Sequence, residues 1–185
     1  MARPLPPVKT GLSFEDYLSF EEVATEKHEF LDGQLFMMAG STEKHNRLCL
    51  ALAASLLAAS DESACRVLMA DVKVRTPNDV GYYPDVLVVC DEEDNHPLVK
   101  RKPCLIVEVL SDSTEAIDRG EKLGNYRLFE SLQAYLLVNQ HLNRIEMYRR
   151  HEDGFWRYEV YEAGQSLQLP CLGLELAVDK LYQGL

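Results

Sequence analysis

The amino-acid sequence predicts a single α/β domain in which a mixed β-sheet is flanked by helices and extended by β-hairpins. The expected elements follow the order helix, strands, helix, strand, which is typical of a mixed α/β core and not of a doubly wound parallel sheet. A chain of 185 residues with 46% hydrophobic content can also bury one substantial core. We therefore expect one domain over residues 13–185, preceded by an N-terminal arm over residues 1–12.

The first elements are a helix and a hairpin. Ser13 and Asp16 form a capping pattern ahead of an amphipathic segment, so a helix is expected to begin after Ser13. Residues 28–40 predict a β-hairpin, because Asp32 and Gly33 provide a two-residue turn between short apolar strands.

A long helix and a strand follow. Residues 41–60 predict a helix that is capped by Ser41 or Thr42 and packs against a sheet, because it is hydrophobic on nearly every side. The alternation over residues 65–76 predicts one strand, and residues 77–81 predict a turn.

The second half of the chain continues the pattern. Residues 111–129 predict another major helix, with Asp112 as its N-cap and Glu115 completing a capping box. Residues 134–140 predict a buried strand, and residues 144–161 predict a hairpin.

Several classes of protein are excluded or disfavoured. The longest apolar run, residues 48–60, is 13 residues long and too short to cross a bilayer, and no signal-peptide pattern precedes it. We therefore expect a cytoplasmic protein with no membrane partner. No glycine-rich phosphate loop and no G-x-S-x-G nucleophile motif occurs, which argues against common nucleotide-binding folds and α/β-hydrolases.

Charge and cysteine content narrow the choice further. The net charge of −11 disfavours an avid, nonspecific nucleic-acid binder, although it permits an enzyme whose acids bind a metal ion. The five cysteines are widely spread and show no paired Cys/His spacing, so we expect reduced, buried thiols and no zinc site.

The most informative feature is a pair of acids on two apolar segments, VLVVC after Asp85 and CLIVEVL around Glu108. Antiparallel pairing with Cys90 opposite Cys104 or Pro103 would use up the connecting loop. With Pro103 as the partner, Asp85 falls opposite Glu108, and their Cβ atoms lie about 5 Å apart.

Two carboxylates this close need a shared proton or a bound cation. A hard divalent ion such as Mg²⁺ suits oxygen ligands. The alternatives are that Asp85 is an exposed aspartate at a strand start and that Glu108 lies at a solvent-exposed edge.

A lysine is expected over these acids. Asp118, Lys122 and Tyr126 repeat every four residues, so they share one face of the helix that follows Glu108. Lys122 could then orient a water molecule and offset charge on a phosphate, although a surface Asp118–Lys122 pair explains the same spacing.

Two further side chains are candidates for the site. Glu29 opens the first hairpin, where an exposed glutamate is the alternative, and His45 near a helix N-terminus could bind an anion, where a solvated histidine is the alternative. The aromatic residues of the late hairpin fit packing better than base stacking; they are Trp156, Tyr158 and Tyr161.

Five blocks together resemble the Uma-type putative restriction endonuclease family, a branch of the PD-(D/E)XK nuclease superfamily. The blocks are HEFLDGQL, GSTEKH, YYPDVLVV, PCLIVEVLSDST and DRGEKLGNY, and the likeness covers about residues 13–183. It implies a restriction-endonuclease-like core in which Asp85, Glu108 and the backbone carbonyl of Val109 bind Mg²⁺ or Mn²⁺.

The resemblance also implies roles for the other candidates. In the superfamily a lysine usually stands two residues after the second acid, but here that residue is Leu110, and Lys122 takes the role. Glu29 resembles an auxiliary acid that holds a second metal or its water, and His45 resembles a histidine near the scissile phosphate.

The expected function is therefore metal-dependent endonuclease activity that hydrolyses DNA phosphodiester bonds. A noncatalytic module that binds nucleic acid or a protein partner is the alternative from another class, and a hydrolase of smaller phosphoesters would use the same residues. A homodimer would suit a duplex substrate, with the late hairpin as a candidate contact.

Overall fold

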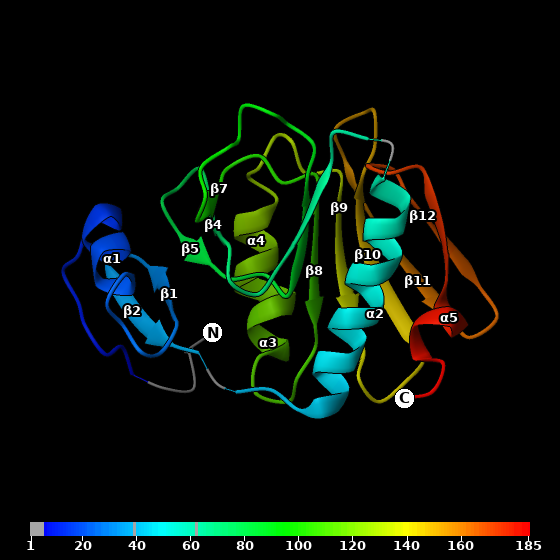
Figure 1. Ribbon diagram of the computed structural model, residues 1–185, viewed down its shortest axis with the longest axis horizontal. Helices are drawn as coiled ribbons and strands as arrows, with labels where there is room; N and C mark the ends of the chain where they lie inside the picture. The colour runs from blue at the N-terminus through cyan, green and yellow to red at the C-terminus, as the bar shows by residue number, and fades with distance from the viewer. Residues whose placement is uncertain (1–5, 39, 62) are drawn as a thin grey trace.

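A six-stranded mixed sheet forms the centre of the computed structural model, which describes residues 6–38, 40–61 and 63–185 (Figure 1). The predicted mixed α/β fold class is confirmed. The strands of this sheet, in spatial order, are β11 (Trp156–Glu162), β10 (Arg144–Arg150), β9 (Ala134–Val138), β8 (Leu105–Val109), β6 (Val86–Val89) and β3 (Arg66–Met69).

The central strand β8 is buried along its whole length because helices cover both faces of the sheet. Leu105, Val107 and Val109 pack in the cluster that contains helix α2 (Glu43–Ser60). Ile106 packs in a second cluster, with residues of helix α4 (Leu123–Tyr126). Since side chains alternate along a strand, Glu108 shares the face of Ile106 and points toward the α4 side.

Helix α2 fixes the position of His45 near one end of the sheet. Thr42 is the N-cap, because its side chain accepts a hydrogen bond from the His45 backbone N–H at 3.1 Å. Leu48, Leu52 and Leu56 follow at a spacing of four residues and are fully buried against the sheet.

A smaller, five-stranded sheet lies to one side of the central sheet and carries α1 (Phe14–Glu21), at the left of Figure 1. The predicted capping box of Ser13 and Asp16 is present at the start of α1. The predicted hairpin turn is also present, with φ angles of 49° at Asp32 and 76° at Gly33. The strands, in spatial order, are β2 (Gln34–Met37), β1 (His28–Leu31), β5 (Gly81–Tyr82), β4 (Lys73–Arg75) and β7 (Val99–Lys100).

The expectation of one strand over residues 65–76 is wrong. The chain forms β3, turns at Ala70, whose φ is 46°, and continues as β4 in the other sheet. The Ala70 backbone N–H donates to the Asp85 carbonyl at 3.2 Å, so this turn lies against the start of β6. Alternation of residue types alone does not reveal that a strand changes sheets.

The helix expected over residues 111–129 is divided, and Asp112 is not its N-cap. The helix begins with α3 (Glu115–Ile117), widens into the π-helical segment η1 (Asp118–Lys122) and ends as α4. The Glu115 backbone N–H donates to the Ser111 carbonyl at 2.9 Å, which leaves the exposed Asp112 to pair with His141 at 3.5 Å.

Four cysteines form disulfides, which corrects the expectation of reduced thiols. Cys65 and Cys90 extend the β3–β6 ladder as cross-strand neighbours and are bonded to each other. Cys104, just before β8, is bonded to Cys171 in the turn between β12 (Ser166–Leu169) and β13 (Leu174–Ala177). Only Cys49 is free, and all five cysteines lie in the described part of the chain.

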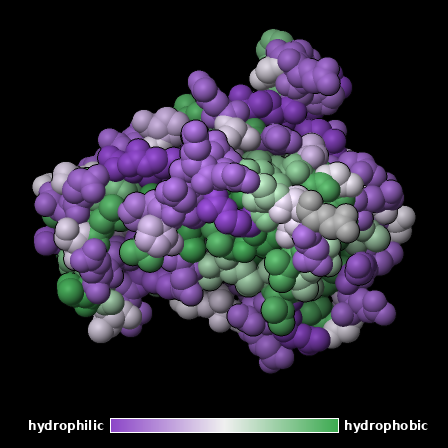
Figure 2. Space-filling model, turned by 45° about the horizontal axis from the view of Figure 1, so that its top comes forward, coloured by the Kyte–Doolittle hydropathy of each residue, from purple (hydrophilic) through white to green (hydrophobic). Residues whose placement is uncertain are grey.

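The remaining segments complete the outer surface. The late hairpin is present as β10 and β11, and α5 (Val178–Tyr182) lies beside α2 near the C-terminus (Figure 1). Hydrophilic residues cover much of the face in Figure 2, with hydrophobic patches between them. No helix among the described residues has the length and hydrophobicity needed to cross a membrane.

Candidate active site

The predicted pairing of the two acid-bearing strands is confirmed. Val86 pairs with Val107, and Leu87 pairs with Ile106, in the antiparallel β6–β8 ladder. Extending this register by one residue places Asp85 opposite Glu108. The Asp85 carboxylate also accepts a hydrogen bond from the Val109 backbone N–H at 2.7 Å, which ties it to the end of β8.

Glu108 is a buried acid, and its exposed fraction is only 3%. Its Oε1 accepts hydrogen bonds from Lys122 Nζ at 3.0 Å and from the Tyr126 hydroxyl at 2.8 Å. Burial raises the pKa of Glu108 well above its usual value, and the nearby ammonium of Lys122 only partly offsets that effect. The alternative of a solvent-exposed edge position for Glu108 is therefore wrong.

Lys122 lies among three carboxylates. Its Nζ is 3.0 Å from Glu108, 3.1 Å from Asp118 and 3.2 Å from Glu29. Burial alone would lower the pKa of Lys122, but the three acids raise it well above its ordinary value, so the amine carries a proton. Because both Asp118 and Lys122 are buried, the alternative of a surface ion pair is wrong.

The π-helical segment η1, which carries both Asp118 and Lys122, is tied to the central sheet by hydrogen bonds. Arg119 lies between them and donates two hydrogen bonds to Glu146 on β10, at 2.5 and 2.8 Å. The Tyr135 hydroxyl on β9 donates to the Asp118 carbonyl at 3.0 Å. These contacts hold η1 against the central sheet with Lys122 directed at Glu108.

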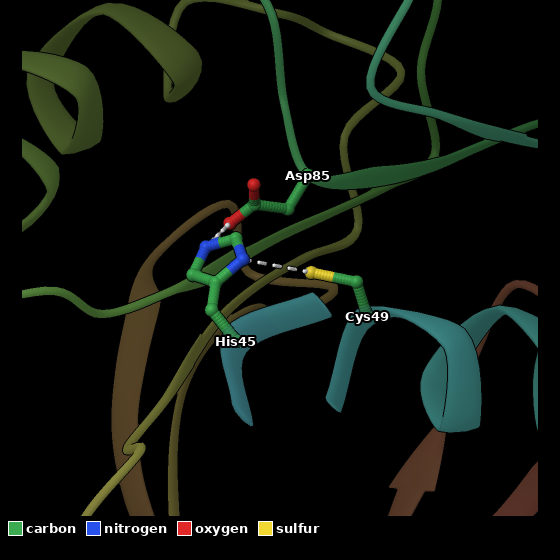
Figure 3. Close-up of side chains that lie close together, drawn as sticks. All are labelled: His45, Cys49 and Asp85. Carbon is green, nitrogen blue, oxygen red and sulfur yellow. Dashed lines mark hydrogen bonds and ion pairs between the residues drawn. The ribbon is translucent and has the colours of Figure 1, made fainter. Parts of the chain in front are cut away.

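His45 approaches Asp85 from the opposite side, through helix α2. Figure 3 shows its ring between the Asp85 carboxylate and the Cys49 thiol, with Nε2 3.2 Å from Asp85 Oδ2 and Nδ1 3.5 Å from Cys49 Sγ. Burial lowers the pKa of His45, but Asp85, the Val109 backbone and Asp118 together outweigh it and the net shift is upward.

Asp85 contacts His45 and His45 contacts Cys49, an arrangement that resembles the acid, base and nucleophile of a catalytic triad. However, burial raises the pKa of the Cys49 thiol far above its usual value, and the charges of Asp85 and Glu108 add to this effect. The thiol stays protonated at neutral pH and is a poor nucleophile.

All the predicted site residues line one cleft of about 450 Å³. They come from five separate parts of the chain, namely Glu29, His45, Asp85, the neighbouring Glu108 and Val109, and Lys122. The structure therefore brings the predicted residues together, while their chemical roles remain predictions. Trp156 packs instead in the cluster around α4, outside the cleft lining.

Sequence reasoning missed two members of this neighbourhood. Asp118 was expected only as a helix-face partner of Lys122, and Cys49 was expected only as a core thiol. The spacing of four residues between His45 and Cys49 in a helix was an available signal for the second.

The donor set fits a divalent cation. Asp85, Glu108 and the Val109 carbonyl supply oxygen atoms, which Mg²⁺ and Mn²⁺ prefer. The buried Asp118 lies behind this set and pairs with Lys122 Nζ at 3.1 Å, so it adds negative charge beside the oxygen donors.

Comparison with known proteins gives a consistent picture. The profile of the Uma2 family, described as "Putative restriction endonuclease", matches residues 14–179. The uncharacterized protein slr1290 of Synechocystis sp. is 40% identical over 176 residues, which cover 94% of this chain and 93% of that protein. The uncharacterized protein sll1609 of the same organism is 36% identical over 149 residues, which cover 78% of this chain and 84% of that protein.

A solved structure shares the fold. It is the crystal structure of a putative nuclease belonging to DUF820 from Anabaena variabilis, with a TM-score of 0.75 and 16% sequence identity. The match covers 93% of this chain and 98% of the other.

Proposed function

The chain belongs to the Uma2 family of putative restriction endonucleases, and we propose that it is a divalent-metal-dependent endonuclease that hydrolyses DNA phosphodiester bonds. The solved structure that shares its fold is itself described as a putative nuclease. The observation that carries the proposal is the cleft in which Asp85, Glu108 and Lys122 meet.

The carboxylates of Asp85 and Glu108 and the carbonyl of Val109 would hold Mg²⁺ or Mn²⁺. The bound ion would supply a Lewis acid that activates water and neutralises charge on the phosphate.

Lys122 would orient the attacking water and offset negative charge in the transition state, because its protonated amine is fixed 3.0 Å from Glu108. Glu29 and Asp118 would keep that amine in position by their ion pairs. The lysine that is usual in the superfamily would stand at position 110, which is Leu110 here. The hydrogen bond from Lys122 to Glu108 supports the proposal that a lysine on the following helix has the same task.

His45 would bind the substrate from the other wall of the cleft. Its ring is a hydrogen-bond donor 3.2 Å from Asp85, and it lies at the start of α2, where helix amides favour negative charge. It would therefore contact an oxygen of the scissile phosphate.

Supercoiled plasmid DNA tests the proposal. Wild-type protein is expected to nick it with Mg²⁺ or Mn²⁺ and not with a chelator. Asp85→Asn, Glu108→Gln and Lys122→Met should each lower the rate by about 10²-fold or more. Glu152→Gln, an exposed acid outside the cleft lining, is the matched control. Equal rates in all variants would place the activity elsewhere.

A noncatalytic binding module is the second candidate, favoured by the net charge of −11. Titration calorimetry separates the two. A nuclease site should bind Mn²⁺ and lose that binding in Asp85→Asn, whereas a binding module need not take up the ion.

We extend the proposal to the assembly. Residues 13–185 would act as one domain, and two copies would form a homodimer that matches the two-fold symmetry of duplex DNA. Within the central sheet, β11 has a neighbour on only one side, so the late hairpin remains the candidate contact. Light scattering after size-exclusion chromatography would test this, and a monomer mass at working concentration would contradict it.

A further inference from the structure

One side chain of the cleft has no part in the proposed hydrolysis. Cys49 lines the cleft, lies outside both disulfides and contacts His45. It follows His45 by four residues in α2, so the two side chains project from the same helix face toward Asp85 (Figure 3).

The three side chains are close enough to bind one ion together. One atom from each residue, the Cys49 sulfur, a His45 ring nitrogen and an Asp85 carboxylate oxygen, lies within 4.8 Å of the others. Zinc binds such atoms at about 2.0–2.3 Å. Asp85 contacts Nε2 of His45 and Cys49 contacts Nδ1, so binding of one ion by all three requires the imidazole ring to turn until one nitrogen faces both partners. All three residues line the cleft, which leaves a side open to a further ligand.

The chemistry of these donors differs from that of the oxygen set. Thiolate and imidazole select borderline-soft ions such as Zn²⁺ and Co²⁺, whereas carboxylate and carbonyl oxygens suit Mg²⁺ and Mn²⁺. We propose that His45, Cys49 and Asp85 form a second cation site, which binds a transition ion of the Zn²⁺ or Co²⁺ class in the same cleft.

The proposal rests on the proposed function in one respect, because Asp85 belongs to both donor sets. Binding converts the Cys49 thiol into a metal-bound thiolate and releases one proton to solvent, with a second from His45 where its ring is protonated. Because Asp85 is shared, Zn²⁺ should compete with Mg²⁺ and act as an inhibitor of the proposed hydrolysis.

Cobalt absorption tests the site directly. The protein is titrated with Co²⁺ without reducing agent, so that the disulfides stay closed and Cys49 is the free thiol. A near-ultraviolet thiolate-to-cobalt charge-transfer band is expected, saturating at one ion per chain. Cys49→Ser should lose the band, and Glu108→Gln, which leaves all three proposed ligands intact, should keep it. Absence of the band in wild type, or its persistence in Cys49→Ser, would overturn the proposal.

Two measurements on the wild type test the site without relying on the correct folding of a variant. Zn²⁺ should raise the melting temperature and release at least one proton per ion, as measured in weakly buffered solution. Zn²⁺ uptake without proton release would rule out the thiolate.

Plasmid cleavage with Mn²⁺, measured in parallel, separates the two hypotheses. Cleavage without a cobalt band would overturn the second site alone. A cobalt band without cleavage would overturn the proposed nuclease function alone.

Discussion

At the scale of the residue, Lys122 determines the charge balance of the cleft. Its buried ammonium group pairs with three buried acids. Replacing Lys122 with a neutral residue would remove the cation that these acids share. We expect Lys122→Met to lower the free energy of unfolding by about 3–5 kcal/mol in metal-free buffer at neutral pH.

The pH dependence of that effect has a definite sign. Burial raises the pKa of Glu108 and Asp118 in the folded protein above their unfolded values. Such groups favour the folded state at low pH and lose that contribution as pH rises through the folded pKa. Without the ammonium of Lys122 this loss of stability is larger. The difference in unfolding free energy between wild type and Lys122→Met should therefore become smaller toward acid pH.

Urea unfolding across this pH range measures both effects, with the exposed Lys180→Met as control. A deficit that stays constant with pH would show that the lysine stabilises the fold by packing and not by charge.

The sequence predicted that the two acid-bearing strands pair, but it left Cys104 and Pro103 as alternative partners of Cys90. The structure has the register of the Pro103 alternative, in which Asp85 falls opposite Glu108. Asp118 has the same residue type and spacing as many surface ion pairs, so its burial depends on what packs over the helix.

At the scale of the element, an ion pair between Arg119 and Glu146 helps to hold the π-helical segment η1 against the sheet. Glu146 on β10 accepts from both Arg119 terminal nitrogens and from the Tyr158 hydroxyl at 2.6 Å. We expect Glu146→Gln to lower the free energy of unfolding by about 2 kcal/mol at neutral pH, because the charge-assisted hydrogen bonds are lost.

The pH dependence of this contact has the opposite sign to that of the cleft acids. The hydrogen bonds from Arg119 lower the pKa of Glu146 below its unfolded value. The contribution is therefore present above the unfolded pKa of about 4.3 and is lost as pH falls through the folded pKa. Thermal melts of wild type and Glu146→Gln should converge in acid, and a difference that persists there would show that the contact is not electrostatic.

The elements that sequence patterns misplaced share one cause. A chain that changes sheets at Ala70, and a helix that widens at Asp118, keep the local residue pattern of a regular strand or helix. The hairpin at Asp32 was predicted correctly, because its turn depends on the two residues that form it. Local chemistry thus predicted local structure, and the exceptions were set by contacts between distant segments.

At the scale of the whole molecule, the negative net charge of the protein opposes binding of the proposed DNA substrate. With 30 acids and 19 bases, the field of the protein repels a polyanion. Duplex binding should therefore depend on the divalent ion, which cancels charge in the cleft, more than on a basic surface.

Fluorescence anisotropy with a short labelled duplex tests this dependence. The Lys122→Met variant prevents cleavage during the measurement if the proposed role of Lys122 holds. Mn²⁺ should tighten binding, and the added variant Asp85→Asn should remove most of that gain. The logarithm of affinity falls by about 0.9 for each phosphate contact per unit of log salt, so few contacts should give a shallow slope. A steep slope together with tight binding in the absence of Mn²⁺ would instead indicate a basic groove that binds DNA independently of the cleft.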